Sequence, residues 1–499
     1  MACATAPDRM NHTLLTVDVE NRGWHDEGAY LGTTTGLYGG KGRSFYLFDS
    51  TAVYGCGSDG QKRDLIFNLS EMGIMSSEFQ LCELPDGRFA VLTAATNQIS
   101  ERSYELVVIS PGSDDRIVLK MLCLAARPSV ARAVSDFNKK NSGYRIELTE
   151  CFPYEENVSN EDWNNAILNL NTQIIAGDMP DIVDMWGLYP EIYNKKGLLE
   201  NLYTYIDEDA EIKLNDYYEN VFDVLTVDGK LPFITNGVAI YTMMADKSVV
   251  GDNSGWTMSE LKALMESQGV YSIGNMNGSH FMSVVLQTSD SFIDWTAGKC
   301  YFDGPEFIEL MELAAIIQES SNFAGDDLST NCIAHFDFVP TAYQVARYRN
   351  LYEGNLNIIG FPDDRGEHHA IYTEAKIGIS STSSHKDGAW DFVRTFLTEE
   401  QQEACELLPI HKGAFATVMQ AAVDGKSQWT TMFENKVTTE DVKITEELLK
   451  STLYTVNDNT ILDKIIFEEA QEFFSGQKTA KDAAENIQSR VSLYMSEQM

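Results

Sequence analysis

Two adjacent histidines, out of eight in the sequence, and many carboxylates are the side chains considered first for metal binding or hydrolysis. His368 and His369 are adjacent, so on regular structure their rings point apart and do not share one metal ion. Carboxylate pairs are plentiful because the chain has 75 Asp and Glu residues, so no pair marks a glycosidase site. The motifs G-x-S-x-G, H-E-x-x-H and G-x-G-x-x-G and the nucleotide P-loop do not occur. The sequence therefore nominates no catalytic residue, no cofactor and no metal site, and it favours binding over catalysis.

Eight cysteines are dispersed along the chain, and none forms a C-x-x-C pair. This spacing argues against a zinc site or a thioredoxin-like motif. We expect mostly buried, unpaired thiols, such as Cys123 within an apolar run. A disulfide between Cys56 and Cys82, inside one small β unit, remains an open alternative.

The charge balance is strongly acidic, with 37 Lys and Arg against 75 Asp and Glu and a net charge of −38. Such a chain repels nucleic acid and anionic membranes, so neither is an expected partner. No apolar run approaches the roughly 20 residues of a membrane-spanning helix. The first residues have neither the basic nor the apolar region of a signal peptide, which predicts a cytoplasmic protein or a missing leader.

The first 115 residues read as short strands without a helical period. Apolar runs at 44–48, 64–67, 89–93 and 104–109 are separated by turn signals. The sequence pattern changes at the Pro-Gly-Ser-Asp-Asp stretch of residues 111–115. We predict a small all-β N-terminal region, one or two blades of a propeller-like unit. About 110 residues do not close a whole propeller.

Strands and helices alternate after this region. Apolar runs at 117–124, 144–148 and 180–185 are separated by helical stripes such as Trp163, Ile167, Leu170 and Ile174. This order predicts an α/β fold with a mostly parallel sheet, whose ligands lie beyond the carboxyl ends of the strands. Further on, the residues Thr257–Glu260 and Thr398–Gln401 form capping-box patterns, and Pro305 opens another helix.

Several segments in sequence order resemble the bacterial extracellular solute-binding proteins of the sugar-binding, maltose-binding-protein-like type. The strongest is 170–186, with its A-G-D-x-P-D-I turn, followed by K-G-L-L at 196–199. Weaker matches lie at 228–233, 255–261, 357–362, 377–383 with 389–393, and 409–415. The resemblance runs from about residue 115 to the end of the chain.

The resemblance implies a two-lobed periplasmic-binding-protein-like fold with a hinge, whose lobes close on a ligand in the cleft between them. We assign 1–115 to the β-rich N-terminal region, 116–235 plus 373–405 to lobe 1, and 236–372 plus 406–499 to lobe 2. The implied function is capture of a small molecule, with a carbohydrate as the ligand class that the resemblance favours, and its delivery to the membrane permease of an ABC importer. The implied state is a monomeric, non-enzymatic, extracellular cell-surface lipoprotein, although Cys3 lacks the apolar stretch that lipidation needs.

The ligand-binding candidates are the residues that the resemblance places on cleft-facing turns and on the second lobe. They combine rings that stack on sugars with polar groups that bind hydroxyls. Trp256 and Trp390 match packing positions, and Trp295 lies in a surface-type turn, so all three are left out. The candidates are Arg127, Asp184, Trp186, Tyr189, Asn236, His280, Phe281, Tyr343 and Arg347.

Two alternative functions stay open. The first is a carbohydrate-active hydrolase that uses two carboxylates. The second is a sensor or adhesion module in which residues 1–115 dock a partner.

Overall fold

A computed structural model describes most of the chain and divides it into two compact units. The first unit comprises Met1–Leu122 and Ala126–Thr149, and the second comprises Cys123–Ala125 and Glu150–Met499. The segment 111–114 and His368 lie outside the described residues. The described residues are 2–5, 11–18, 20–31, 36–48, 52–57, 63–69, 72, 74, 79–96, 102–110, 115–152, 158–274, 276–288, 291–295, 297–317, 331–363, 369–427, 435–456 and 460–498.

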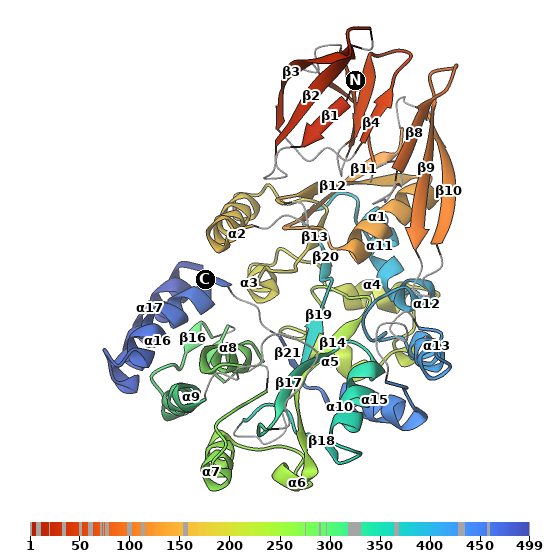
Figure 1. The fold of residues 1–499 in the computed structure, drawn as a ribbon. Coiled ribbons are helices and arrows are strands. Elements are labelled where there is room, and N and C mark those ends of the chain that lie inside the picture. Colours follow the sequence, from red (N-terminus) through yellow and green to blue (C-terminus); the bar gives the residue numbers. More distant parts are fainter. Residues whose placement is uncertain are drawn as a thin grey trace. The chain divides into compact units, whose positions relative to one another are not determined.

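The N-terminal part of the first unit consists of three antiparallel sheets (Figure 1). Its described residues before 116 form strands and no helix, as the sequence predicts, and they form no closed propeller or barrel. The first sheet contains β1 (Ala2–Thr5), β2 (Asn11–Asp18) and β3 (Gly23–Leu31), the second β4 (Gly36–Gly39), β5 (Phe45–Phe48), β6 (Ala52–Cys56) and β7 (Arg63–Asn68), and the third β8 (Phe79–Glu83), β9 (Phe89–Thr96) and β10 (Arg102–Ile109).

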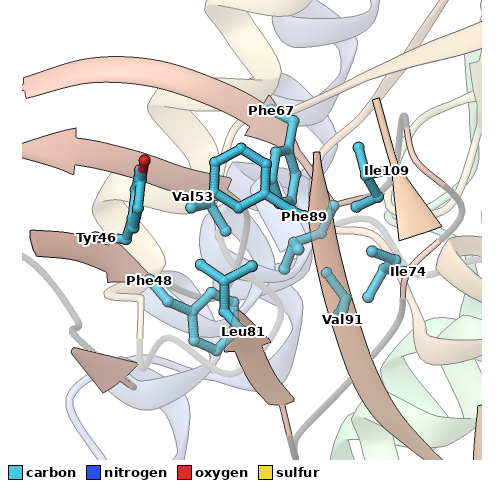
Figure 2. Packing of buried hydrophobic residues seen from close by; sticks show 10 residues of the cluster. Tyr46, Phe48, Val53, Phe67, Ile74, Leu81, Phe89, Val91 and Ile109 are labelled. Atoms are coloured by element: carbon cyan, nitrogen blue, oxygen red, sulfur yellow. The ribbon is translucent and has the colours of Figure 1, made fainter. Parts of the chain in front are cut away.

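The second and third of these sheets share one hydrophobic core (Figure 2). Val53 and Val91 are fully buried in it, and the ring of Phe89 meets Tyr46 and Phe67 edge-on at centroid distances of 5.1 and 5.6 Å. Alternate residues of each strand face this core, as period-2 burial requires.

The possible disulfide between Cys56 and Cys82 is wrong, because neither residue forms a disulfide bond. Cys56 is buried on β6 beside Phe45 and Leu47, whereas Cys82 is exposed on β8. Their side chains therefore belong to different environments of the β region.

A β-α-β segment follows, in the order that the sequence predicts. It consists of β11 (Ile117–Cys123), α1 (Pro128–Lys140) and β12 (Tyr144–Glu150). The side chain of Asn138 fastens α1 to β12: its Oδ1 accepts a hydrogen bond from the Ile146 N–H (2.7 Å), and its Nδ2 donates to the Ile146 carbonyl (3.0 Å).

The second unit is built around a five-stranded sheet. Its long strand β14 (Val238–Asp246) pairs antiparallel with β17 (His335–Val339), β18 (Leu356–Ile358) and β19 (Ala370–Thr373). The short strand β21 (Tyr454–Thr455) runs parallel to β19. Elsewhere β13 (Ile182–Asp184) pairs antiparallel with β20 (Ile377–Ile379), a pairing that the local β/α alternation did not predict.

Helices surround these strands, and their ends follow local sequence signals. Thr257 and Glu260 form the expected capping box, and Pro305 occupies the first turn of its helix. The helices are α2 (Asn160–Ile175), α3 (Pro190–Lys195), α4 (Leu202–Glu208), α5 (Glu219–Leu225), α6 (Lys247–Val250), α7 (Met258–Gln268), α8 (Gly278–Thr288), α9 (Pro305–Ile316), α10 (Ala342–Leu351), α11 (Lys386–Val393), α12 (Glu399–Glu403), α13 (Lys412–Val423), α15 (Thr439–Ser451), α16 (Thr460–Phe474) and α17 (Ala480–Gln498). In the part of the chain that the structure describes, none of them is long and apolar enough to cross a membrane.

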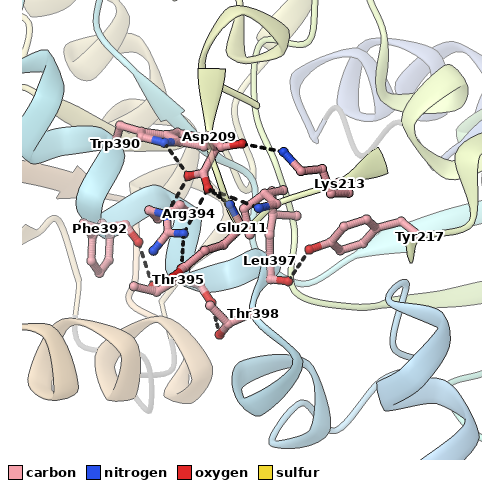
Figure 3. A network of polar contacts seen from close by, with 11 residues as sticks. Asp209, Glu211, Lys213, Tyr217, Trp390, Phe392, Arg394, Thr395, Leu397 and Thr398 are labelled. Atoms are coloured by element: carbon pink, nitrogen blue, oxygen red, sulfur yellow. Dashed lines mark hydrogen bonds and ion pairs between the residues drawn. The ribbon is translucent and has the colours of Figure 1, made fainter. Parts of the chain in front are cut away.

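A charged network joins the end of α4 to the turn after α11 (Figure 3). The Arg394 guanidinium donates to both carboxylate oxygens of Asp209, at 2.7 and 3.1 Å, and also to Glu211. The Trp390 indole N–H donates to the same carboxylate at 3.1 Å. Trp390 therefore packs and anchors this network, in keeping with its expected structural role.

Candidate functional site

A cleft in the second unit consists of two adjoining cavities that share Glu191, Val224 and Thr455. The first cavity lies among the turn after β13, helix α5 and the segment from β19 to β20, and it includes Trp186, Gly187, Leu188, Pro190, Leu225, Val227, Phe233, Tyr372, Thr373, Lys376 and Val456. The second cavity has a volume of about 230 Å³ and includes Leu286, Phe292, Ile293, Trp295, Phe302, Leu453, Tyr454, Leu462, Asp463 and Ile466.

Asp184 organises the turn that carries Trp186. Its Oδ1 accepts hydrogen bonds from the backbone N–H of Trp186 (3.0 Å) and of Lys376 (3.1 Å). Asp184 is 1% exposed, so it joins β13 to the segment before β20 from inside the protein. This bridge positions Trp186 and Lys376 together on the wall of the first cavity.

Trp186 is held from behind by another tryptophan. Its ring meets Trp163 of α2 edge-on, with centroids 5.4 Å apart and planes at 73°. The next residue, Gly187, has a φ of +71°, and a Cβ there would lie 2.9 Å from Leu124 and 3.2 Å from the Trp163 ring. The turn therefore requires glycine to bring Trp186 against Trp163.

Trp295 forms a wall of the second cavity, which corrects its placement in a surface turn. Its side chain is only 9% exposed, and its ring stacks on Tyr189 with centroids 6.1 Å apart and planes at 12°. Tyr189 directly precedes α3, so the stack joins two segments that are distant in sequence. No local pattern around Trp295 indicated this contact, because its partner lies on another loop.

The cleft contains three charged side chains, Glu191, Lys376 and Asp463. Burial raises the pKa of the Glu191 carboxyl, and the nearby Lys376 ammonium only partly offsets this effect. The Asp463 carboxylate accepts a hydrogen bond from Gln287 at 3.2 Å. Among the described residues, no group of three or more His, Cys, Asp or Glu side chains is arranged to hold a metal ion.

Half-buried aromatic rings extend from the first cavity along the five-stranded sheet. Tyr372 stacks on Tyr241, with centroids 5.9 Å apart and planes at 6°, and meets Phe338 at 5.3 Å. Phe336 contacts Tyr241 on one side and the predicted site residue His280 on the other, at 5.3 and 5.9 Å. His280 is thus connected to the first cavity through a continuous row of rings.

The remaining predicted site residues line neither cavity. Phe281 is fully buried in α8 and Tyr343 is 2% exposed in α10, while Asn236 is 2% exposed just before β14. Arg127 is the N-cap residue of α1, in the first unit. Arg347 stands near Asp337, whose pKa burial raises to about 6 despite the Arg347 charge. Of the nine predicted site residues only Trp186 lines either cavity, and a ligand role for all nine stays a prediction.

Comparisons with known proteins agree with this architecture. A family model described as bacterial extracellular solute-binding protein matches residues 126–403, more than half of the chain. Among solved structures, the sugar-binding protein MalE of Xanthomonas citri is 15% identical, with a TM-score of 0.50 over 76% of this chain and 98% of that one. A de novo designed cysteine esterase gives 15% identity and a TM-score of 0.51 over 77% and 98% of the two chains.

The structural likenesses establish the α/β fold of two-lobed periplasmic binding proteins, and the family match establishes membership. Proteins of this family are in general solute-binding components of transport systems and not enzymes. The chain therefore belongs to the bacterial extracellular solute-binding protein family.

Proposed function

We propose that this protein captures a carbohydrate in its cleft and delivers it to the membrane permease of an ABC importer. The observation that carries the proposal is the lining of the cleft, where Trp186, Trp295 and Tyr372 stand beside Glu191, Lys376 and further polar groups. Aromatic faces pack on the apolar faces of sugar rings, and polar side chains match hydroxyls that both donate and accept.

The arrangement of the cleft supports ligand capture by closure. Its walls come from segments near residues 186–191, 224–233, 292–302, 372–376 and 453–466, which the predicted lobe boundaries divide between lobe 1 and lobe 2. Closure is favoured only if the ligand binds the closed form better than the open form. MalE of Xanthomonas citri, which shares the fold, is a sugar-binding protein, and this agrees with a carbohydrate ligand here.

The setting that we propose follows from family membership. The intact protein acts outside the cytoplasm as a monomeric lipoprotein anchored at the cell surface. Its partners are the small ligand and the permease.

A thermal-shift screen over mono- and oligosaccharides, followed by calorimetry, tests the proposal. A sugar that binds only the native state must raise the unfolding midpoint. Replacing Trp186 with Ala removes a wall of the first cavity, and we expect the affinity for that sugar to fall tenfold or more. The ligand-free unfolding midpoint of the variant shows whether the fold survives.

The matched control is Trp24→Ala, because Trp24 is 71% exposed in the first unit. This substitution should leave sugar affinity unchanged. Equal affinity of the Trp186→Ala variant and the unmodified protein would remove Trp186 from the site, and the absence of any sugar binding would contradict the proposed function.

A further inference from the structure

The second cavity has an uneven distribution of charge. Its charged lining residues are two carboxylates, Glu191 and Asp463, and no Lys, Arg or His is present among the described residues that line it. The remaining wall is mainly apolar or aromatic, with Phe292, Trp295 and Tyr454 among its members. Carboxylates in such a partly apolar wall attract a positively charged group more strongly than a neutral one.

The Glu191 carboxylate is incompletely compensated by the protein. Among the described residues it forms no ion pair, and a hydrogen bond from its own backbone N–H and the charge of Lys376 only partly offset the cost of burial. Lys376 lines the first cavity and not the second. On the side of the second cavity, Glu191 therefore has room for a cationic partner.

Trp295 supplies an independent sign of a ligand. Its indole Nε1–H is buried and has no acceptor among the described residues. The whole residue is only 9% exposed. A buried N–H without an acceptor is costly, so such groups are normally satisfied by protein, water or ligand. Trp295 lines the second cavity, and its stack on Tyr189 fixes the position of the ring.

We propose that the second cavity binds an ammonium group that lies next to a hydroxyl or ether oxygen, as in an amino sugar. The ammonium has three donors for the two carboxylates, and the oxygen accepts from the Trp295 N–H. The aromatic wall adds cation–π attraction to the same charge. This inference rests on the proposed function, since it specifies which carbohydrate the cleft prefers.

Calorimetry with matched ligand pairs tests the inference. The pairs are glucose with glucosamine, and cellobiose with the β-1,4-linked dimer of glucosamine, measured at about pH 6.5 so that the amines are charged. In at least one pair the amino sugar should bind ten times more tightly than its neutral partner, because a desolvated ion pair and its hydrogen bonds are gained. Putrescine, a diamine without hydroxyls, serves as a third kind of ligand.

The Glu191→Gln variant separates charge recognition from shape. It should lower amino-sugar affinity about tenfold more than it lowers neutral-sugar affinity, because only the amino sugar loses an ion pair. The matched control is Glu266→Gln, an exposed carboxylate on α7, which should change neither affinity.

The pH dependence provides a readout that a purely structural role of Glu191 would not give. Amino-sugar affinity should fall as the pH falls from about 6.5 to 4.5, because Glu191 binds an ammonium only when ionised and its pKa is raised. The other charged groups that line the cleft are Lys376 and Asp463, and both remain in the variant. The decline should therefore be shallower in Glu191→Gln than in the unmodified protein.

The possible results distinguish this inference from the proposed function. Neutral and amino sugars that bind equally would overturn the ammonium site while the proposed function stands. Binding of putrescine without any sugar would support the ammonium site and overturn the carbohydrate assignment. Binding of none of these ligands would overturn both.

Discussion

Asp209 shows how a single buried charge is stabilised in this protein. Its side chain is 6% exposed, and burial alone would raise the pKa of its carboxyl. Hydrogen bonds from Arg394 and from the backbone N–H of Glu211 and Ile212 outweigh that effect and lower the pKa well below its usual range. The ionised form is thus favoured in the folded state, which links folding to pH.

The first prediction concerns acid unfolding and uses Asp209→Asn. The stability that the ionised carboxylate contributes is present above its unfolded pKa, about 3.9, and is lost as the pH falls toward the lower folded value. We expect the variant to be less stable by about 3 kcal/mol at pH 7, because Arg394 loses its buried partner. Between about pH 5 and pH 3 it should lose less stability than the unmodified protein.

Urea unfolding followed by circular dichroism at each pH measures both effects. The control is Asp252→Asn, which removes an 89% exposed partner of Lys247 and should cost less than about 1 kcal/mol. If the free energy of unfolding changed with pH equally in Asp209→Asn and in the unmodified protein, ionisation of Asp209 would not be linked to folding.

Among the residues that line the cleft, sequence patterns pointed to Trp186 and did not point to Trp295, Glu191 or Lys376. Trp186 was found because it ends the motif at 170–186, which resembles the family closely. Trp295 belongs to no such motif, and its role depends on Tyr189, which lies on a different loop. In the sequence, Glu191 and Lys376 could not be distinguished from the many other charged residues. The fold shows that both line the first cavity.

At the level of elements, helices α8 and α9 pack closely because the first residue of α8 is glycine. A Cβ on Gly278 would lie 1.8 Å from the carbonyl oxygen of Ala314, a distance that no rotamer change can relieve. The helices would have to separate, which disturbs neighbours such as Phe281 and Leu310, both fully buried. Gly278 is therefore needed for packing and not for backbone conformation.

We predict that Gly278→Ala lowers the free energy of unfolding by about 2 kcal/mol, the usual range for overpacking. Helix propensity alone would favour alanine by about 1 kcal/mol, so the two explanations predict opposite signs. Urea denaturation measures the change. In the control, Gly143→Ala, the nearest atom would be Asn141 Oδ1 at 3.8 Å, and little change is expected.

At the scale of the whole molecule, the cleft belongs entirely to the second of the two units. A ligand present at 100 times its Kd stabilises the native state by about 2.7 kcal/mol. We expect a bound sugar to slow hydrogen exchange of β14 and β19 amides, which lie in the unit that binds it. The amides of β5 and β9, in the core of the first unit, should exchange at unchanged rates.

Hydrogen exchange read by mass spectrometry of peptides from both units measures this difference. Equal protection of β5 and β14 on ligand addition would show that the two units unfold together. The control is hydrogen exchange of the Trp186→Ala variant at the same sugar concentration. Because this variant binds the sugar more weakly, its β14 and β19 amides should be protected less.

Features that depend on nearby residues were predicted from the linear sequence alone. The apolar stripe from Trp163 to Ile174 predicted a helix, which is α2. The Thr257–Glu260 pattern predicted the observed capping box, and the apolar runs predicted strands β5, β7, β9 and β10. Helix periodicity and capping involve residues three or four positions apart, so both can be predicted from local sequence patterns. The motif at residues 170–186, which resembles the family, added the prediction of a two-lobed α/β fold.

Contacts between residues far apart in the chain became apparent only once the fold was known. The pairing of β13 with β20, the stack of Tyr189 on Trp295 and the position of Glu191 between two cavities each depend on segments far apart in the chain. Burial then determined their chemistry, because the same carboxylate that is solvated on a surface has a raised pKa and needs a partner inside a cleft. Residue type and spacing do not encode that environment, since it is formed by the packing of the whole unit.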